Sequence, residues 1–340
     1  MTVEKMHLFY EEPDPDRWLP YDRYPRSLIR RLIRGKPRPG GVMRWFLNLK
    51  AGLDELGVSY VVNDYWSLKK NPGAVALVIG KHHVLGKISE GHPIVFGPGL
   101  ASHPLGNPFW GKKDIRLLLI SCDWFAKMYE RDLPVRIPIR VWAAGIETEL
   151  WKPLKNKTKS GKILIYDKIR WEREKYEKEL LGPVRQIIIE KGFQPVEVRY
   201  LFYREEEYLK LLQEVDAMVF LCEHETQGFA YLQALSCDVP ILAWDRGGFW
   251  RDPSYYPDKV KFTPVTSVPY WSPSCGDKFQ NIEELSEKFN NFTKCLNKKK
   301  FSPRKYILEN FKLKTKSRCY VNLVHTTIHI RSGPICRVIH

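Results

Sequence analysis

The sequence predicts an α/β protein of two domains, each built on an open parallel sheet. Its 340 residues, 44% hydrophobic and 13% aromatic, are enough for two ordinary domain cores. Short runs rich in β-branched and aromatic residues alternate with longer amphipathic segments. This alternation stops at one polar stretch and then begins again. Such a strand-helix-strand order favours parallel sheets, so the interruption indicates two similar halves.

In the first half, the strand-length apolar runs span residues 7–10, 59–63, 74–79, 93–96, 116–120 and 139–143. The clearest helix is expected over residues 42–56. There Trp45, Leu49 and Leu53 recur at helical spacing, and Gly57 ends the pattern.

The interruption covers residues 147–161, a Lys-rich segment that contains Pro153. Strands are then expected at 162–166, 196–200, 217–221, 239–243 and 260–262, and helices at 282–296 and, with breaks, at 303–324. We therefore predict an N-terminal domain over 1–146, a linker over 147–161, a C-terminal domain over 162–302, a helix crossing back over 303–327 and a tail over 328–340. Ligands of two such sheets are expected in a cleft between the halves, beyond the carboxyl ends of the strands.

The charge balance points to anionic partners. Fifty-five Lys and Arg residues face 39 Asp and Glu residues, which leaves a net charge of +16. Nucleic acid, an acidic membrane surface and a diphosphate substrate all fit that charge. The longest apolar runs have the length of a strand, so no membrane-spanning helix is expected.

Cysteine usage and the first residues favour a cytoplasmic protein. The seven cysteines are scattered and form no C-x-x-C motif, which is typical of reduced thiols. The beginning of the sequence lacks the profile of a secretory signal. Asp14-Pro15-Asp16 spells a D-x-D string, but proline at its centre favours a loop, and we expect no bound metal.

Residues 215–243 contain the most informative pattern: a buried strand, a polar loop with one glycine, a short helix and another strand. Gly228 lies where the helix should begin, so its bare backbone would let a phosphate approach the amides at the positive end of the helix dipole. Glu225 precedes it in the loop. Gln233 follows Phe229 by four residues and so lies on the same helix face.

This stretch resembles the donor-binding signature of retaining GT-B glycosyltransferases of the family-four type (glycosyl transferases group 1), in which an E-x7-E pair brackets a glycine. Gly40-Gly41 resembles the glycine loop of that group's N-terminal domain. Residues 141–153 resemble its interdomain hinge, and residues 303–311 its terminal helices. The resemblance covers nearly the whole chain in the right order. It implies the GT-B fold, two Rossmann-like domains facing across a cleft, with the acceptor on the N-terminal side.

The same resemblance implies a metal-independent enzyme that moves a sugar, with retention, from a nucleotide-diphosphate sugar to an acceptor. The nucleotide sugar is a co-substrate, and no cofactor is expected. Glu225 would contact hydroxyls of the donor sugar, and Thr226, Gln227, Gly228 and Phe229 would belong to the donor loop.

Gln233 takes the place of the ribose-binding Glu of that family. An amide offers one acceptor where a carboxylate offers two, so this departure weakens the expected donor contact or marks a site without activity. The alternatives are a half-exposed helix residue at Gln233 and an ordinary loop carboxylate at Glu225.

Enzymes that resemble this one place an Arg and a Lys, from the loop after the first C-domain strand, beside the leaving diphosphate. Lys168 and Arg170 are the candidates here, with Arg173 third. The usual R-x4-K spacing is not reproduced, and a solvated helix start would explain the same residues.

His103 lies in a Gly/Pro loop after an expected strand and is a candidate catalytic residue facing the transferred sugar; a structural hydrogen-bonding role is the alternative. In residues 26–34, apolar and arginine side chains would take opposite faces of a helix. That pattern suits peripheral contact with the inner face of a membrane and a lipid-linked or surface-polysaccharide acceptor. A helix packed on the N-terminal domain is the alternative.

Two other functions fit part of the sequence. Gln233 suits a GT-B scaffold or sugar-binding subunit that has lost catalysis. The net charge and many aromatic residues suit a nucleic-acid-binding protein, but no recognised motif supports this, and nucleic acid is not an expected partner.

Overall fold

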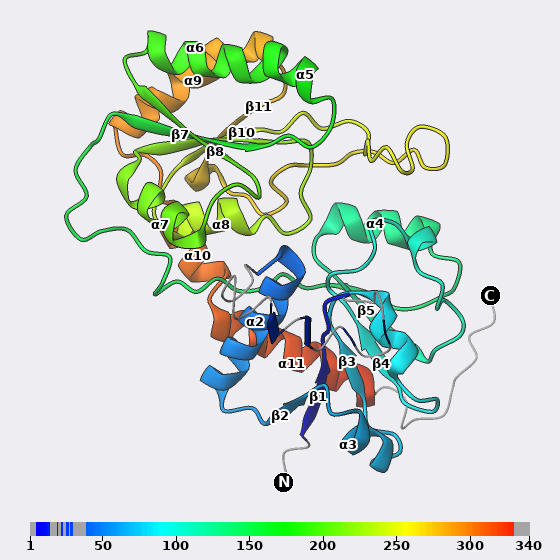
Figure 1. Cartoon of the computed structure of the whole chain (residues 1–340). Coiled ribbons are helices and arrows are strands. Elements are labelled where there is room, and N and C mark those ends of the chain that lie inside the picture. The colour runs from blue at the N-terminus through cyan, green and yellow to red at the C-terminus, as the bar shows by residue number, and fades with distance from the viewer. Residues whose placement is uncertain are drawn as a thin grey trace. The chain divides into compact units, whose positions relative to one another are not determined.

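The computed structural model describes residues 5–13, Leu19, Asp22, Pro25, Arg26, Leu28, Ile29 and 39–329. It holds two compact α/β units, each with an all-parallel sheet (Figure 1), which confirms the predicted fold class. The first unit comprises Met1–Ser121, Tyr129–Trp142 and Lys316–His340, and the second Cys122–Met128 and Ala143–Thr315. The residue boundaries predicted for the domains stay predictions.

The sheet of the first unit has the order β2-β1-β3-β4-β5-β6. Its strands are β1 (Met6–Phe9), β2 (Tyr60–Val62), β3 (Ala76–Val78), β4 (Ile94–Phe96), β5 (Ile115–Ile120) and β6 (Ile139–Val141). Its helical segments are α2 (Gly41–Leu56), α3 (Tyr65–Lys70), η1 (His82–Lys87), η2 (Pro104–Gly106) and, shared with the second unit, α4 (Asp123–Asp132).

Helix α2 follows from its sequence as predicted. Trp45, Leu49 and Leu53 are buried on one face, and Gly57 closes the helix in the left-handed conformation at φ 69°. Glycine adopts that conformation without the steric cost that a Cβ atom brings.

The sheet of the second unit has the order β11-β10-β9-β7-β8. Its strands are β7 (Lys162–Lys168), β8 (Gln194–Arg199), β9 (Ala217–Cys222), β10 (Ile241–Trp244) and β11 (Gly276–Phe279). Its helical segments are α5 (Arg173–Tyr176), η3 (Glu177–Leu181), α6 (Gly182–Glu190), α7 (Glu205–Glu214), α8 (Phe229–Ser236), η4 (Pro273–Cys275), α9 (Ile282–Asn297) and α10 (Pro303–Asn310). Helix α11 (Leu313–His329) begins in this unit and continues in the first.

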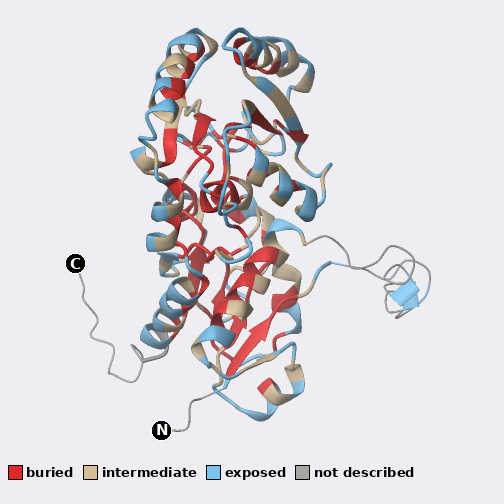
Figure 2. Cartoon of the chain, turned by 90° about the vertical axis from the view of Figure 1, so that its left-hand side faces the viewer, coloured by how far each residue is buried: buried red, intermediate tan, exposed pale blue. Residues whose placement is uncertain are grey.

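Helices cover both faces of the second sheet (Figure 1). Strand β9 alternates its side chains between them. Met218 and Phe220 pack in a core with residues of α7, α8 and α10, whereas Val219 and Leu221 pack with residues of α6 and α9. Figure 2 shows the central strands as buried and the outer helix turns as exposed. The unit is therefore doubly wound, and its site must lie at a strand end, because helices cover its faces.

One predicted strand is wrong and another was missed. Residues 260–262 form no strand; Val260 and Phe262 are buried in a long loop, which explains their apolar character. The fifth strand is β11, which reads Gly-Asp-Lys-Phe and lies at the sheet edge. Half-buried polar residues on an edge strand give no alternating apolar signal.

The segment that resembles an interdomain hinge is held to the chain near α11. The Ile146 amide donates to the Phe311 carbonyl over 2.7 Å, and Ile146 forms a parallel bridge with Lys312. A Cβ atom on Gly145 would lie 2.7 Å from the Leu313 Cα, so glycine is required by this close backbone approach.

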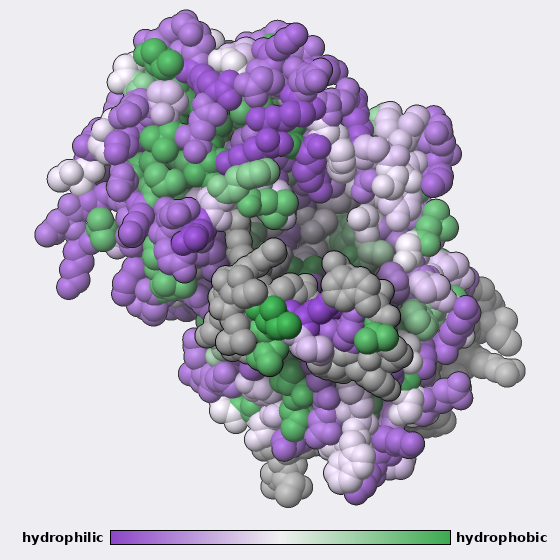
Figure 3. Space-filling view, in the orientation of Figure 1, coloured by the Kyte–Doolittle hydropathy of each residue, from purple (hydrophilic) through white to green (hydrophobic). Residues whose placement is uncertain are grey.

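Some predictions fall outside the described residues: the D-x-D string, most of residues 26–34 and all of the tail beyond His329. Leu28 and Ile29 are described and are 60% and 53% exposed. No helix within the described ranges has the length and apolar character to cross a membrane. Hydrophilic residues cover most of the second unit's surface in the view of Figure 3.

Candidate functional site

The topology of the second unit marks one end of its sheet. The chain leaves β7 for β8 on one side and then returns to form β9 on the other. Ligands of doubly wound sheets bind at such a switch point, outside the carboxyl ends of the strands. Lys168, the last residue of β7, lies opposite Cys222, the last residue of β9. The segments that follow these two strands therefore face each other.

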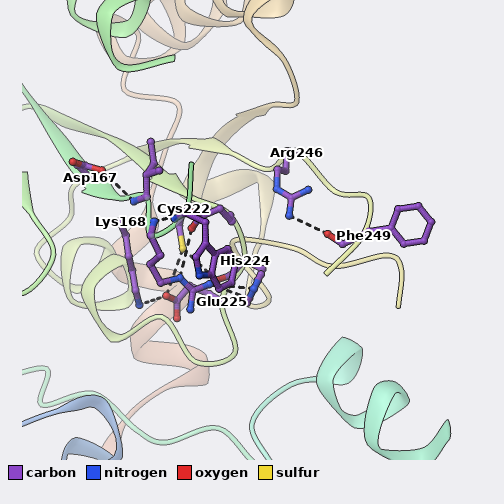
Figure 4. Close-up of polar contacts among 11 residues, drawn as sticks. Asp167, Lys168, Cys222, His224, Glu225, Arg246 and Phe249 are labelled. Atoms are coloured by element: carbon purple, nitrogen blue, oxygen red, sulfur yellow. Dashed lines mark hydrogen bonds and ion pairs between the residues drawn. The ribbon is translucent and has the colours of Figure 1, made fainter. Parts of the chain in front are cut away.

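Lys168 and Glu225 form an ion pair at this point. The Lys168 ammonium donates to Glu225 Oε1, and the Cys222 thiol lies 3.6 Å from the same oxygen (Figure 4). Burial lowers the pKa of Lys168, but the adjacent Glu225 carboxylate outweighs that effect and raises it above its ordinary value. The ammonium also lies 4.4 Å from the centre of the Tyr200 ring. The lysine is therefore held charged beside the carboxylate.

Arg170 lies on a loop that Glu223 holds in place. Glu223 Oε1 accepts from the backbone amides of Arg170 and Trp171, over 2.7 and 3.0 Å. The carboxylate is 3% exposed. Because it binds backbone amides, it fixes the course of the loop after β7 and so the position of the Arg170 side chain.

His224 is buried among tryptophan rings. Its ring centre lies 5.5 Å from that of Trp124 and 5.4 Å from that of Trp171. Burial and the nearby Arg170 hold the pKa of His224 well below its ordinary value, so the ring is neutral at pH 7. One Arg170 guanidinium nitrogen lies 3.1 Å from Nε2 and 3.4 Å from Nδ1, and since a guanidinium only donates, the unprotonated ring nitrogen accepts.

Arg173 is turned away from this cluster. Its guanidinium pairs with Asp167 and, over 3.1 Å, with Glu177. Both partners are carboxylates of the second unit, so they neutralise the charge of Arg173. The structure thus brings Lys168 and Arg170 together with the loop after β9 and leaves Arg173 in a separate ion-pair network.

Gly228 lies at the start of α8, as predicted, and the packing there gives a further reason for glycine. It has φ 70°, and a Cβ atom there would lie 2.0 Å from Cε1 of the buried Tyr231 ring. The protein itself therefore requires glycine at this position. No side chain caps α8. The positive end of the helix dipole thus begins at the loop that carries Glu225.

The other residues of the donor loop differ in surroundings. Thr226 and Phe229 are half-buried. Gln227 is buried, and its Oε1 accepts from the Ala144 amide over 3.2 Å, which ties the loop to the hinge-like segment. Gln233 is 6% exposed rather than half-exposed, and its amide forms no hydrogen bond with any described residue.

The candidate residues of the first unit are His103, Gly40 and Gly41, and their contacts are those of residues with a structural role. His103 is 2% exposed; its Nε2 lies 2.7 Å from Asp132 Oδ2, and its Nδ1 accepts from the Leu105 amide. With both ring nitrogens engaged, the geometry favours the hydrogen-bonding alternative. Gly40 and Gly41 begin α2, where a Cβ atom on either would meet nothing within 4 Å.

Sequence reasoning missed Glu223 and His224. They are the two residues before Glu225, and Arg170 contacts both. An acidic residue directly after a buried strand was the available signal for Glu223. Nothing in the sequence indicated the tryptophans around His224, since Trp124 and Trp250 lie far away in the chain. Among the described residues, no group of three or more His, Cys, Asp or Glu side chains is arranged to hold a metal.

No protein-family model and no curated protein matches the sequence. Solved structures match the fold. Anabaena HepE in complex with UDP and glucose has a TM-score of 0.56 at 9% identity, over 95% of this chain and 100% of that one. S. aureus TarM, solved as a mutant with Fondaparinux, alpha-GlcNAc-glycerol and UDP, has a TM-score of 0.52 at 12% identity, over 76% of this chain and 57% of that one.

These likenesses show that the chain has the GT-B fold. The chain covers 59% of the pneumococcal O-GlcNAc transferase GtfA and 57% of TarM, so it spans less than two thirds of those chains.

Replacing Gly228 with alanine is expected to destabilise the second unit by about 2–5 kcal/mol, because left-handed backbone strain adds to the overlap with Tyr231. Gly192→Ala is the matched control: its φ is also positive, at 78°, but no atom lies within 4 Å of the new Cβ. Urea unfolding measures both. Equal losses in the two variants would contradict the role given to Tyr231.

Folding stability is expected to depend on pH through His224. Since its folded-state pKa lies below the unfolded value, the unfolded chain binds more protons as pH falls below about 6.5, and stability drops by up to about 1.4 kcal/mol per pH unit. Denaturant unfolding at pH 7 and pH 5 should show a larger loss for the wild type than for His224→Gln. An identical loss would show that His224 does not titrate as described.

Proposed function

We propose that this protein is a retaining, metal-independent glycosyltransferase of the family-four type that takes its sugar from a nucleotide diphosphate. The observation that carries the proposal is the placement of Lys168 and Glu225, together with the uncapped start of α8, at the switch point of a GT-B second domain. Cations and the amides of a helix start bind phosphate, and a fixed carboxylate can accept hydrogen bonds from a sugar. Lys168, the start of α8 and Glu225 would supply these groups at one strand end.

Lys168 and Arg170 would face the leaving diphosphate. An ammonium has three N–H donors, of which Glu225 takes one, so Lys168 can donate to phosphate oxygens while the ion pair persists. Arg170 is positioned by Glu223 through the backbone and has further donors in its planar fork. Arg173 is the weaker candidate, because Asp167 and Glu177 already neutralise it.

Glu225 would accept hydrogen bonds from hydroxyls of the donor sugar. Its ion pair with Lys168 fixes the direction of the carboxylate, so the sugar would lie beside the phosphate position. Gln233 would contact the ribose from the same helix; its amide has no partner among the described residues and can donate and accept. His103 receives no role in this proposal.

In the reaction, the bond between the sugar's anomeric carbon and the diphosphate oxygen breaks. A new bond forms from the acceptor oxygen to the same face of that carbon, and the leaving diphosphate takes the acceptor's proton. Charge grows on the diphosphate as the bond breaks, and Lys168, Arg170 and the α8 amides would stabilise it. No metal or cofactor is part of the proposal.

The comparisons support a nucleotide sugar as donor. HepE is known in complex with UDP and glucose and with UDP-glucose, and the TarM mutant in complex with UDP. UDP is therefore the first nucleotide to test.

Calorimetry with UDP, GDP and ADP tests the proposal. The wild type should bind at least one of them, and the Lys168→Met/Glu225→Gln double variant, which leaves no lone buried charge, should bind about 10–100-fold more weakly. Lys175→Met is the control, since it removes an exposed charge of the same unit that pairs with Glu172 over 3.7 Å. If no nucleotide binds the wild type at about millimolar concentration, or if the double variant binds equally well, the proposal is wrong.

The acceptor is unidentified. We propose a lipid-linked or cell-surface polysaccharide precursor, reached through peripheral contact of residues 26–34 with an anionic membrane, and the exposure of Leu28 and Ile29 supports this. The protein should sediment with vesicles containing phosphatidylserine but not with neutral vesicles. Leu28→Ser/Ile29→Ser should abolish this; unchanged sedimentation of the variant would contradict the contact.

A further inference from the structure

One pocket of the second unit has a lining that the proposed function does not use, apart from Glu223, which also holds the loop of Arg170. Its volume is about 290 Å³, and it lies where the segments after β7, β9 and β10 meet. Its lining includes three aromatic rings and four charged side chains: Trp171, Tyr176, Tyr256, Glu172, Glu223, Arg246 and Arg251.

Two lining residues each keep a buried polar atom without a hydrogen-bond partner. Glu223 uses Oε1 for the amides of Arg170 and Trp171, while Oε2 accepts no hydrogen bond; the nearest cationic nitrogen is Arg170 Nε, 3.6 Å away. Arg246 donates through both terminal nitrogens to the carbonyls of Gly247 and Phe249, while its Nε–H has no acceptor. Buried polar groups in folded proteins are nearly always paired, so an unpaired acceptor and donor at one pocket point to a ligand.

The side chains that line the pocket indicate the class of ligand. A hydroxyl group donates and accepts at once, so it can satisfy a carboxylate oxygen and a guanidinium N–H together. The rings of Trp171, Tyr176 and Tyr256 offer apolar surface to the C–H face of a sugar. The volume lies near the lower end of small-molecule pockets and suits one monosaccharide unit. A bare anion would pair with the arginines but would oppose the buried Glu223 carboxylate.

The pocket and the proposed nucleotide site are neighbours at the same strand end, but Lys168 and Glu225 do not line the pocket. Leu221 belongs to the core under α6 and α9, against which Tyr176 packs, whereas Cys222 belongs to the core under α8. Glu223 lines the pocket, whereas Glu225 contacts Cys222 and Lys168. In Figure 4, Arg246 lies apart from the Lys168 and Glu225 pair and points at the Phe249 carbonyl.

We propose that this pocket binds a single neutral sugar residue, whose hydroxyls bridge Glu223 Oε2 and Arg246 Nε. The proposal goes beyond the transfer reaction, because it concerns a second saccharide subsite that requires no nucleotide. The pocket would hold a sugar unit of a larger saccharide next to the site of transfer.

Saturation-transfer NMR with methyl glycosides of glucose, galactose, mannose and N-acetylglucosamine, without nucleotide, tests the subsite. At least one glycoside should bind the wild type with a Kd in the millimolar range. Glu223→Gln keeps an oxygen for the loop amides but can turn the unpaired acceptor into a donor, and it should weaken binding about tenfold or more. Competition among the four glycosides would rank their affinities for the pocket.

Tyr256→Leu is the second variant, should Glu223→Gln disturb the fold. It removes one ring of the wall, should weaken glycoside binding severalfold and should leave UDP affinity unchanged. Binding of inorganic phosphate in place of any glycoside, absence of glycoside binding up to about 100 mM, or equal binding by both variants would overturn the subsite. Because UDP affinity is measured on the same samples, failure of the subsite and failure of the proposed nucleotide site are distinguishable.

Discussion

The register between β7 and β9 is the constraint on which the candidate site depends. Because Lys168 lies opposite Cys222 in the ladder, the segments leaving both strands start side by side. Glu225 then reaches the Lys168 ammonium, and Glu223 reaches the amides of the loop after β7. A shift of one residue would send each of these side chains to the other face of the sheet. The backbone pairing of β7 and β9 thus determines where the charged side chains of the two following loops lie.

The formal charges at this strand end nearly cancel. Lys168 and Arg170 are matched by Glu225 and Glu223, and Arg173 by Asp167. The protein's net charge of +16 is therefore not concentrated here. In the proposed reaction, selectivity for a diphosphate comes from directed donors: the spare N–H groups of Lys168, the guanidinium of Arg170 and the uncapped amides of α8. Buried ion pairs fix direction more than they add stability, and that suits such a site.

The sequence predicted the two parallel-sheet units, nearly all strands and the long helices, because their apolar periodicity is set by burial in a sheet or against it. It did not predict β11, whose polar edge residues carry no such signal. Among the site candidates, the nearness of Lys168, Arg170 and Glu225 follows from strand ends meeting in a parallel sheet. The contact of His103 with Asp132 could not be foreseen, since 29 residues separate them. Nor could the Tyr231 ring behind Gly228, which depends on side-chain packing rather than on spacing.

A crystal structure with UDP bound would show whether this strand end holds the diphosphate. We expect the β-phosphate within hydrogen-bond distance of the first amides of α8 and of the Lys168 ammonium, with Glu225 beside the position that the sugar would take. UDP held elsewhere, with the start of α8 unoccupied and Lys168 contacting only Glu225, would contradict this expectation.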